Sequence, residues 1–332
     1  MHDFVIFNKA TKIQKKVNPF FVYFCTQNKT MSQDLFSLID CSPTPSKPTL
    51  CVLTGPTAVG KTELSLQLAE QYRTAIVSSD SRQFYQEMSI GTAKPTSKEL
   101  ERVPHHFIGQ LSVQDYYSVS RFEQDVLKLL PSLFAKSPVV LLVGGSGLYI
   151  DAVCKGIDDL PDPDPIIREE VIALYENEGI DALRRQLKLL DPPFYEQTDI
   201  ANHKRLIRAL EVCLQTGSPY SSYLKSNRKE RPFEIKKYCL MRPREELFQR
   251  INLRVDQMME EGLLEEAKSL LSYRNLNALN TVGYKELFQY MDGALSLEEA
   301  VEQIKTNTRR YAKRQMTWFK RDGEYKEIMI NE

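Results

Sequence analysis

The sequence predicts an α/β fold, in which helices flank a parallel sheet and a small helical domain is inserted into the chain. Three observations support this prediction. A glycine-rich loop stands between a strand-like and a helix-like segment, two further apolar strands follow with a helical pattern between them, and a stretch rich in proline and aspartate interrupts the chain near its middle. Strands and helices in this order build parallel sheets with right-handed crossovers, which bind ligands at the carboxyl ends of their strands.

The glycine-rich loop fits the phosphate-binding pattern G-x-x-x-x-G-K-[ST] at every required position. Residues 50–53 before it are apolar and typical of a strand, and residues 64–69 after it carry apolar side chains at helical spacing. Glycines let backbone N–H groups face anionic oxygens, Lys61 adds a positive charge, and Thr62 can hold a Mg²⁺ ion. We therefore expect a P-loop NTPase-like sheet with a bound phosphate or diphosphate. The predicted binding residues are Gly55, Pro56, Thr57, Ala58, Val59, Gly60, Lys61 and Thr62.

Two more segments are expected to reach the same edge of the sheet. Residues 74–78 form a second predicted strand that runs into Asp80, and residues 138–143 form a third that stops at Gly144, after a predicted helix over 118–134. P-loop hydrolases and kinases place an acidic magnesium ligand at the end of the third strand. Gly144 stands there instead, which argues against routine ATP hydrolysis although Asp80 could substitute, so the bound phosphate need not belong to ATP.

Changes in composition divide the chain into parts. Residues 1–47 are expected to lie outside the fold, as a disordered tail or as an extension upstream of a true start at Met31, and the Asp- and Pro-rich residues 158–165 are typical of a hinge. The predicted parts are an N-terminal extension over 1–47, the first part of the core over 48–157, a helical insertion over 158–201, a mostly helical completion of the core over 202–325 and a tail over 326–332. Within the completion, helices are expected over 205–216, 244–273 and 297–320 and a strand over 236–240.

Composition also limits the class of protein. The 332 residues carry 44 basic and 44 acidic side chains, so no overall field marks a nucleic-acid binder and any basic surface is local. The six cysteines form no C-x-x-C pair and the four histidines lack zinc-ligand spacing, which favours reduced thiols. No apolar run reaches the length of a membrane span. We expect a cytoplasmic monomer that does not contact a membrane.

Eight motifs occur in order between residues 50 and 320. They occupy residues 55–62, 80–85, 90–95, 104–106, 144–149, 205–211, 282–284 and 313–318. Together they resemble the motif set of the tRNA dimethylallyltransferases, which move a five-carbon dimethylallyl group from its diphosphate to N6 of the adenosine immediately 3′ of certain tRNA anticodons. The N-terminal extension lies outside the resemblance, and the zinc-finger tail of eukaryotic members is absent. Ser146 stands where members often carry threonine, and the pair His203-Lys204 departs from the family pattern.

The resemblance implies dimethylallyl diphosphate and the anticodon stem-loop of tRNA as partners, Mg²⁺ as cofactor, and catalytic roles for Thr57, Lys61, Asp80 and Arg314. The chemistry agrees for the loop, because its amides, Lys61 and Mg²⁺ would stabilise a diphosphate leaving group. Adenine N6 is a poor nucleophile, so a base that accepts its proton would help, and Asp80 is the candidate. The alternative is that Asp80 only caps the turn after its strand.

A base must leave the stack of an anticodon loop to be modified, so the resemblance implies a channel with RNA at one end and the diphosphate at the other. The residues expected to contact tRNA are Asp80, Ser81, Arg82, Gln83, Ser146, Arg168, Lys204, Arg205, Leu206, Ile207 and Arg208. Arg205 and Arg208 could equally brace a helix.

Residues 305–321 carry seven basic side chains and no acidic one. At helical spacing, Tyr311, Gln315 and Trp318 share one face and the basic residues lie broadly opposite. The segment is either a solvated amphipathic helix or a phosphate-contacting surface, and the resemblance favours an approach of Arg314 to phosphates. Trp318, Tyr284 and the pair 105–106 are expected to pack in the core.

Three other functions remain open at this point: a transferase acting on free adenine nucleotides, a P-loop nucleotide kinase, and a nucleic-acid-binding module with a regulatory nucleotide. The helical insertion and the second basic segment favour tRNA over a free nucleotide. A kinase is expected to carry paired arginines soon after the third strand, where residues 158–165 are instead acidic and rich in proline. A passive binder has no use for Asp80 beside a diphosphate site.

Overall fold

The computed structural model describes residues 38–39, 46–225 and 228–330. The predicted N-terminal extension over residues 1–47, including the possible start at Met31, therefore lies outside the described residues except at 38–39 and 46–47. Among the described residues, no helix is long and apolar enough to cross a membrane.

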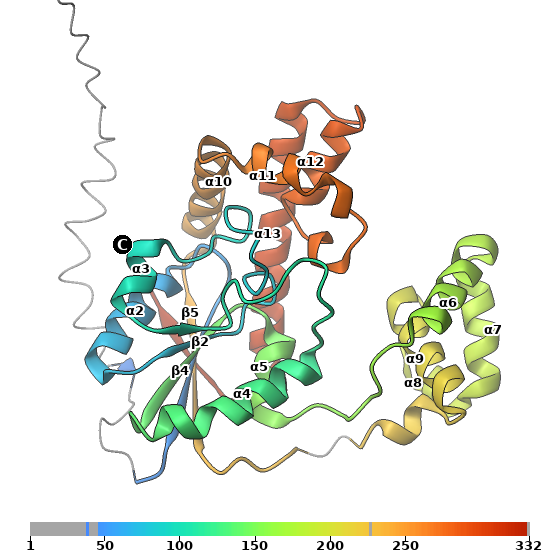
Figure 1. The fold of residues 1–332 in the computed structure, drawn as a ribbon, viewed down its shortest axis with the longest axis horizontal. Helices are drawn as coiled ribbons and strands as arrows, with labels where there is room; N and C mark the ends of the chain where they lie inside the picture. The colour runs from blue at the N-terminus through green and yellow to red at the C-terminus, as the bar shows by residue number, and fades with distance from the viewer. Residues whose placement is uncertain (1–37, 40–45, 226–227, 331–332) are drawn as a thin grey trace, which may run out of the picture. The chain divides into compact units, whose positions relative to one another are not determined.

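A six-stranded parallel sheet forms the centre of the core (Figure 1). Its strands, in the order in which they lie side by side, are β3 (His105–His106), β2 (Ile76–Ser78), β4 (Val139–Gly144), β1 (Thr49–Thr54), β5 (Glu234–Met241) and β6 (Tyr325–Met329). All six residues of β1 are buried, as expected for a strand covered on both faces. The predicted P-loop type of α/β fold is confirmed, although β3 and β6 were not predicted.

The register of the sheet brings the three predicted loops together. Thr54 pairs with Gly144 across β1 and β4, and Ser78 pairs with Val143 across β2 and β4. The segments that follow these three strands therefore leave the sheet at one edge, as the sequence predicts. The helices that follow or precede them in the first part of the core are α2 (Lys61–Tyr72), α3 (Ser97–Arg102), α4 (Val119–Phe134) and α5 (Gly147–Lys155).

The C-terminal part of the core is helical. Its helices are α10 (Arg244–Glu260), α11 (Leu263–Ser269), α12 (Tyr284–Met291) and α13 (Leu297–Arg321), with short 3₁₀ turns at Leu271–Tyr273 and Asn277–Leu279. The helical pattern predicted over 244–273 is broken at Gly262, whose φ of 102° ends one helix and allows the next to begin. Tyr284 is fully buried in an apolar cluster of these helices, which confirms its predicted core role.

A separate cluster of helices follows the predicted hinge. It consists of α6 (Pro165–Glu178), α7 (Ile180–Leu190), α8 (Pro192–Gln197) and α9 (His203–Thr216), followed by a 3₁₀ turn at Tyr220–Tyr223. Leu206 and Leu210 of α9 pack with Leu183, Leu187 and Phe194 in one apolar core. The boundary predicted at residue 201 therefore lies inside this helical unit, because α9 supplies one wall of its core.

The predicted tail over 326–332 also differs from the structure. Residues 325–329 form β6, which pairs in parallel with β5, and Ile328 is buried. The sheet thus continues to the C-terminal end of the described chain.

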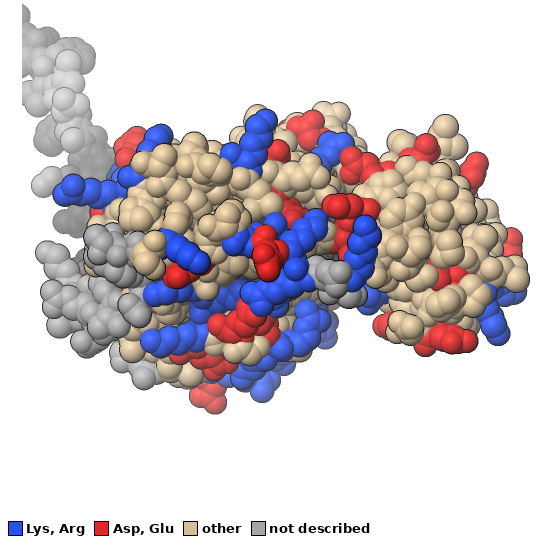
Figure 2. Space-filling view, turned by 90° about the horizontal axis from the view of Figure 1, so that it is seen from below, with Lys and Arg blue, Asp and Glu red and all other residues tan. Residues whose placement is uncertain are grey.

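Charged side chains of both signs are intermixed on the face of the molecule drawn in Figure 2. This agrees with the balance of 44 basic and 44 acidic residues. A nucleic-acid partner would have to be recognised by local groups rather than by a field of one sign.

Candidate active site

The phosphate-binding loop connects β1 to α2 and has a backbone shape that its sequence permits. Gly55 has a φ of 146° and Gly60 a φ of 111°, both in the region that favours glycine. A Cβ on Gly55 would also lie 2.6 Å from the carbonyl oxygen of Leu240. The chain enters α2 at Lys61, so the N–H groups of the first helical turn face the loop and lack intrahelical acceptors. A loop of this shape at a helix N-terminus can bind an anion. The predicted phosphate site therefore stays a prediction that the geometry permits.

Lys61 is folded back on this loop. Its Nζ donates hydrogen bonds of 2.9 Å to the carbonyl oxygens of Gly55 and Pro56. Burial, together with the charge of Arg254, lowers the pKa of Lys61 to about 8, while the opposite charge of Asp80 acts to raise it. The positive charge of Arg254 is therefore close enough to act on Lys61.

Arg254 was not predicted as a site residue. It lies on α10, and burial lowers its pKa from the usual range while Glu99 acts to raise it. Arg254 is half-buried and its charge acts on the phosphate-loop lysine, and an arginine offers a planar donor that suits phosphate oxygens. In the sequence it is an ordinary helical arginine, and only the packing of α10 reveals its position.

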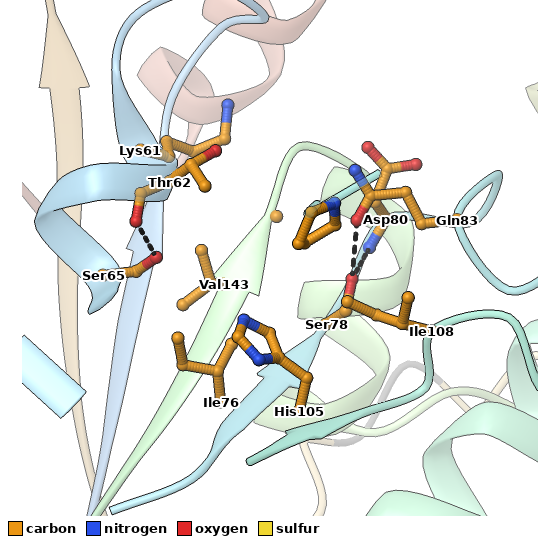
Figure 3. Close-up of a pocket in the computed structure, with 12 residues that line it drawn as sticks. Lys61, Thr62, Ser65, Ile76, Ser78, Asp80, Gln83, His105, Ile108 and Val143 are labelled. Atoms are coloured by element: carbon orange, nitrogen blue, oxygen red, sulfur yellow. Dashed lines mark hydrogen bonds between the residues drawn. The ribbon is translucent and has the colours of Figure 1, made fainter. Parts of the chain in front are cut away.

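A pocket opens between the phosphate loop and the ends of the neighbouring strands (Figure 3). Its polar lining includes the predicted residues Lys61, Thr62, Asp80 and Gln83, and Gly144 also borders it. Its other lining residues are the polar Ser65, Ser78 and His105 and the apolar Ile76, Pro95, Ile108 and Val143. One pocket therefore combines an anion-binding end, a carboxylate and an apolar wall.

Asp80 faces this pocket at the end of β2. Its Oδ1 accepts a hydrogen bond of 3.0 Å from the backbone N–H of Arg82, so it also caps the turn that follows the strand. Burial raises the pKa of Asp80 above its ordinary value, although the N–H of Arg82 and the charge of Lys61 oppose this shift. Asp80 thus caps a turn and is also a half-buried carboxylate that faces the pocket. Capping the turn leaves its other oxygen available, so the predicted role as a base is compatible with the capping role.

Gly144 occupies the position where a P-loop hydrolase carries its acidic magnesium ligand, and the packing explains why. A Cβ at this position would lie 2.4 Å from Oγ and 2.6 Å from the carbonyl carbon of Ser79. No side chain fits there without moving the backbone of the neighbouring strand. The structure therefore has no room for a carboxylate at the end of β4.

Helix α13 brings Gln315 and Tyr311 to the site and also carries Arg314. Gln315 is buried and contacts the phosphate loop, since its Oε1 accepts a hydrogen bond of 2.9 Å from the N–H of Thr57. Burial and the nearby charge of Asp80 raise the pKa of Tyr311. Arg314 is exposed, and its guanidinium lies 5.9 Å from the centre of the Tyr311 ring. The predicted face of Tyr311 and Gln315 therefore turns toward the site, and Arg314 is exposed beside Tyr311.

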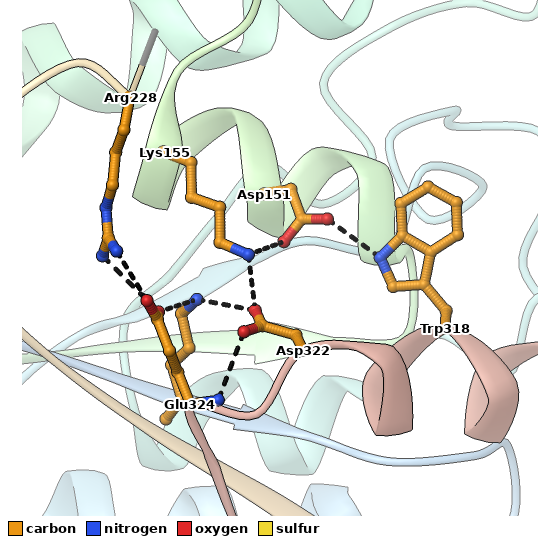
Figure 4. Close-up of polar contacts among 7 residues, drawn as sticks. Asp151, Lys155, Arg228, Trp318, Asp322 and Glu324 are labelled. Carbon is orange, nitrogen blue, oxygen red and sulfur yellow. Dashed lines mark hydrogen bonds and ion pairs between the residues drawn. The ribbon is translucent and has the colours of Figure 1, made fainter. Parts of the chain in front are cut away.

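The C-terminal end of α13 is fixed by an ionic cluster (Figure 4). Trp318 donates a hydrogen bond of 3.0 Å to Asp151 and packs so closely on Gly147 that a Cβ there would lie 2.3 Å from its ring. Although burial opposes it, hydrogen bonds from Lys155 and the buried Lys237 lower the pKa of Asp322 to about 2. Trp318 therefore packs within the protein, as predicted.

The residues predicted to contact tRNA after β2 are largely engaged within the protein. Arg82 donates to the carbonyl oxygens of Asn277 and Ala278 at 2.8 and 3.1 Å. Gln83 donates to the carbonyl oxygens of Thr92 and Ala93, both at 3.1 Å. Ser81 and Ser146 bind each other, the backbone N–H of Ser81 at 3.0 Å and its Oγ at 3.1 Å from the Ser146 Oγ. These side chains brace the walls of the site.

The second predicted tRNA segment is divided. Leu206 and Ile207 are 0% and 8% exposed in the core of the helical unit, so a contact of either residue with tRNA would have to be made by its backbone. Arg168 and Arg208 both pair with Glu211, which is fully buried, at 3.0 and 3.2 Å. Lys204 and Arg205 are exposed on α9, and Arg205 lies over the Phe194 ring. Only these two residues of the segment present exposed cations.

The pair 105–106 was predicted to pack in the core, and for His105 this is wrong. His105 forms part of β3 and lines the pocket, with its Nδ1 2.8 Å from the carbonyl oxygen of Val103. Burial lowers its pKa, which favours the neutral ring. Two adjacent histidines carry no signal of a strand edge, so the sequence could not place them.

Comparison with known proteins gives consistent matches. A family model described as IPP transferase matches residues 83–322. The chain is 57% identical to tRNA dimethylallyltransferase 1 of Bacteroides thetaiotaomicron over 277 residues, which are 83% of this chain and 90% of that protein. It is 51% identical to tRNA dimethylallyltransferase of Christiangramia forsetii over 278 residues, 84% of this chain and 92% of that protein.

Solved structures agree with the sequence matches. The chain is similar to the full-length tRNA isopentenylpyrophosphate transferase from Bacillus halodurans, with a TM-score of 0.61 and 38% identity over 85% of this chain and 90% of that one. It is also similar to a eukaryotic dimethylallyltransferase solved acting on tRNA, with a TM-score of 0.71 and 27% identity over 86% of this chain and 74% of that one.

Proposed function

This chain belongs to the IPP transferase family, and on that premise we propose that it transfers a dimethylallyl group from dimethylallyl diphosphate to N6 of the adenosine 3′ to the anticodon of tRNA. The observation that carries the proposal is the pocket in which the Asp80 carboxylate shares one space with Lys61 and Thr62 of the phosphate loop. A carboxylate and a diphosphate cradle on opposite sides of one pocket suit a proton-coupled displacement better than a phosphate transfer.

The donor would bind by its diphosphate. Backbone N–H groups at the start of α2, Lys61 and Arg254 are the donors available for its oxygens. The apolar wall of Ile76, Ile108 and Val143 would receive the five-carbon group, whose burial contributes about 4 kcal/mol at roughly 0.8 per carbon. Charge would anchor the donor, and the apolar wall would select it.

Magnesium fits this site as an ion shared with the diphosphate. No group of three His, Cys, Asp or Glu side chains that could hold a metal ion lies within the described parts of the chain, and Gly144 excludes a carboxylate from the end of β4. Mg²⁺ commonly keeps several waters and binds one or two protein oxygens plus phosphate oxygens, which the exposed Thr62 hydroxyl suits. When bound there, the ion would neutralise charge on the leaving diphosphate.

The chemical step would be a substitution at the allylic carbon. A bond forms between adenine N6 and that carbon, the bond from the carbon to the diphosphate oxygen breaks, and its electron pair leaves with the diphosphate. The Asp80 carboxylate would accept the proton from N6. The raised pKa of Asp80 makes it a better base than an exposed aspartate, since basicity rises with pKa.

The Thr57 hydroxyl and Arg314 would assist from the two sides of the site. Thr57 lies in the loop and is only partly buried, and Arg314 is exposed on α13. We propose that Arg314 meets phosphates of the donor or the RNA, and that Lys204 and Arg205 meet the RNA backbone at the helical unit. We further propose that the protein acts as a monomer in the cytoplasm.

Labelled dimethylallyl diphosphate tests the function directly. The purified protein is incubated with Mg²⁺, the labelled donor and either bulk tRNA or AMP, and the modified nucleosides are separated after digestion. We expect label in tRNA as N6-(dimethylallyl)adenosine and none in AMP. Label in AMP alone would assign the enzyme to free nucleotides, and consumption of ATP without labelled product would favour a kinase.

A further inference from the structure

Three consecutive residues of the phosphate loop are each held by a side chain from the C-terminal part of the core. The N–H of Thr57 binds Gln315 Oε1, the carbonyl oxygen of Ala58 binds Arg250 Nε, and the carbonyl oxygen of Val59 binds Arg242 Nε, each at 2.9 Å. These anchors come from the end of β5, from α10 and from α13. No local sequence pattern around the loop contains them.

Arg250 binds a loop residue, Ala58, whose backbone conformation is unfavourable. Ala58 has a φ of 64°, a left-handed conformation that costs a residue with a Cβ about 1 kcal/mol or more. Such a conformation persists only where the surroundings hold it. Arg250 holds the Ala58 carbonyl by a charge-assisted hydrogen bond, and Ala58 is itself buried.

The two outer anchors are themselves fixed. Arg242, which lies between β5 and α10, is 9% exposed and pairs with Glu246 in the first turn of α10. Gln315 is 6% exposed, and its Nε2 donates a hydrogen bond of 2.9 Å to the carbonyl oxygen of Gly145. A Cβ on Gly145 would lie 2.2 Å from that nitrogen, so the glycine leaves the space that the amide fills.

The anchors decide which way the loop's dipoles point. With the carbonyl oxygens of Ala58 and Val59 bound to arginines, those oxygens cannot turn toward an anion, where they would repel it. Preorganised N–H groups cost no reorganisation when charge develops on a leaving group. A loop without these anchors would have to become ordered when the diphosphate binds, and the free energy of that ordering would lower the affinity.

We propose that Arg250, Arg242 and Gln315 are positioning residues that preorganise the phosphate loop for the diphosphate of the donor. The inference rests on the proposed function for the identity of that donor, but the binding of a diphosphate to the loop does not depend on the acceptor. Each anchor acts through the loop backbone, so its removal is expected to weaken the binding of the diphosphate and to leave the binding of RNA unchanged.

The test compares anchor variants with matched controls on the same helices. Arg250→Gln and Gln315→Met remove anchors, and Arg250→Lys keeps a cationic donor. Arg244→Gln on α10 and Gln303→Met on α13 alter exposed residues of the same kinds. For each full-length variant, calorimetry measures the affinity for inorganic pyrophosphate with Mg²⁺, steady-state kinetics gives KM for the donor and for tRNA, and thermal unfolding gives Tm.

We expect Arg250→Gln and Gln315→Met to weaken pyrophosphate binding and raise the donor KM about tenfold, with the tRNA KM unchanged. Arg250→Lys is expected to recover part of that loss, and the controls to match the unsubstituted protein. A purely structural role would lower Tm and the active fraction without separating the two KM values. Pyrophosphate affinity and donor KM unchanged in both anchor variants would overturn the inference.

The outcomes separate this inference from the proposed function. If the unsubstituted protein prenylates tRNA but the anchor variants bind pyrophosphate normally, the positioning role fails alone. If no RNA is prenylated but the anchor variants lose pyrophosphate affinity, the proposed function fails and the positioning role stands. Absence of pyrophosphate binding by the unsubstituted protein would refute the positioning role, and the labelling assay would then decide the proposed function by itself.

Discussion

The phosphate loop and the basic segment of α9 (His203–Thr216) both carry sequence motifs, but the residues of the two motifs lie in different surroundings. In the loop, Lys61 and Thr62 line the pocket that their motif predicts. In the segment 204–208, Leu206 and Ile207 are buried and Arg208 pairs with the buried Glu211, which leaves Lys204 and Arg205 exposed. The motif of the loop specifies a backbone shape, so its residues lie together at one pocket. The motif on the helix combines side chains that pack in the core with side chains that are exposed and free to bind a partner.

The largest effect is expected from substitution of Asp80, because this change should affect the chemical step and leave the binding of diphosphate to the loop intact. Asp80→Asn is expected to lower the turnover number about 10³-fold, because the proton on N6 loses its acceptor. Affinity for inorganic pyrophosphate is expected to stay the same or to tighten, since a negative charge beside Lys61 is removed. Single-turnover transfer and calorimetry measure the two. Unchanged turnover would remove Asp80 as the base.

Lys61→Met tests the anion end of the same pocket. The loss of a charge-assisted donor is expected to weaken pyrophosphate binding about tenfold to a hundredfold. The matched control is Lys98→Met on α3, where the lysine is exposed and outside the pocket. Calorimetry checks both variants. Equal affinities in the two would show that the diphosphate binds elsewhere.

The pH dependence of kcat/KM tests the two charged groups of the pocket separately, Lys61 at alkaline pH and Asp80 at acid pH. Lys61 must be protonated, so kcat/KM for the donor is expected to fall as the pH rises above about 8, the pKa of Lys61 in the free protein. Asp80 must be ionised, so kcat/KM is also expected to fall at acid pH, with an apparent pKa above the ordinary value of an aspartate. A profile that stays flat up to pH 10 would contradict the role of Lys61.

The smallest effects are expected in the helical unit. There, substitutions test which basic residues stabilise the fold and which contact RNA. Arg208→Gln leaves the buried Glu211 with Arg168 as its one remaining ion-pair partner among the described residues and is expected to lower the free energy of unfolding by about 1–3 kcal/mol. Arg185→Gln, which removes an exposed pair with Glu178, is expected to change it by less than about 0.5 kcal/mol. Denaturant unfolding measures both.

Lys204→Gln is the complementary change. Stability is expected to stay the same because the side chain is exposed, whereas the tRNA KM rises a few-fold and its dependence on salt becomes shallower. Kinetics at two salt concentrations checks this. If Arg208→Gln instead raised the tRNA KM more than Lys204→Gln at unchanged stability, the division of the segment into folding and binding residues would be wrong.

Much of the core could be predicted because its signals are local. The strand and helix patterns around residues 50–69 and 118–143 lie where the structure has β1, α2, α4 and β4. Residues 325–329 could not be assigned, because a short alternating segment becomes β6 only when β5 is there to pair with it. The end of the helical unit was missed for a similar reason: α9 has the same helical periodicity whether it packs on the sheet or on α7.

The site divides in the same way. Lys61, Thr62 and Asp80 stand in patterns with a chemical meaning, so the sequence alone brings them together. Arg254 and the loop anchor Arg250 look like any other arginines on an amphipathic helix. Their roles depend on where α10 packs, a tertiary property that no spacing along the chain encodes.

The central claim is that the phosphate loop holds the donor's diphosphate with Asp80 facing its allylic carbon. A crystal structure with Mg²⁺ and the unreactive thio-analogue of dimethylallyl diphosphate measures this directly. We expect the diphosphate on the N–H groups at the start of α2, Lys61 turned from the carbonyl oxygens of Gly55 and Pro56 to the phosphates, and the Asp80 carboxylate open toward the allylic carbon. A diphosphate bound away from residues 55–62, or an allylic group pointing away from Asp80, would contradict the account.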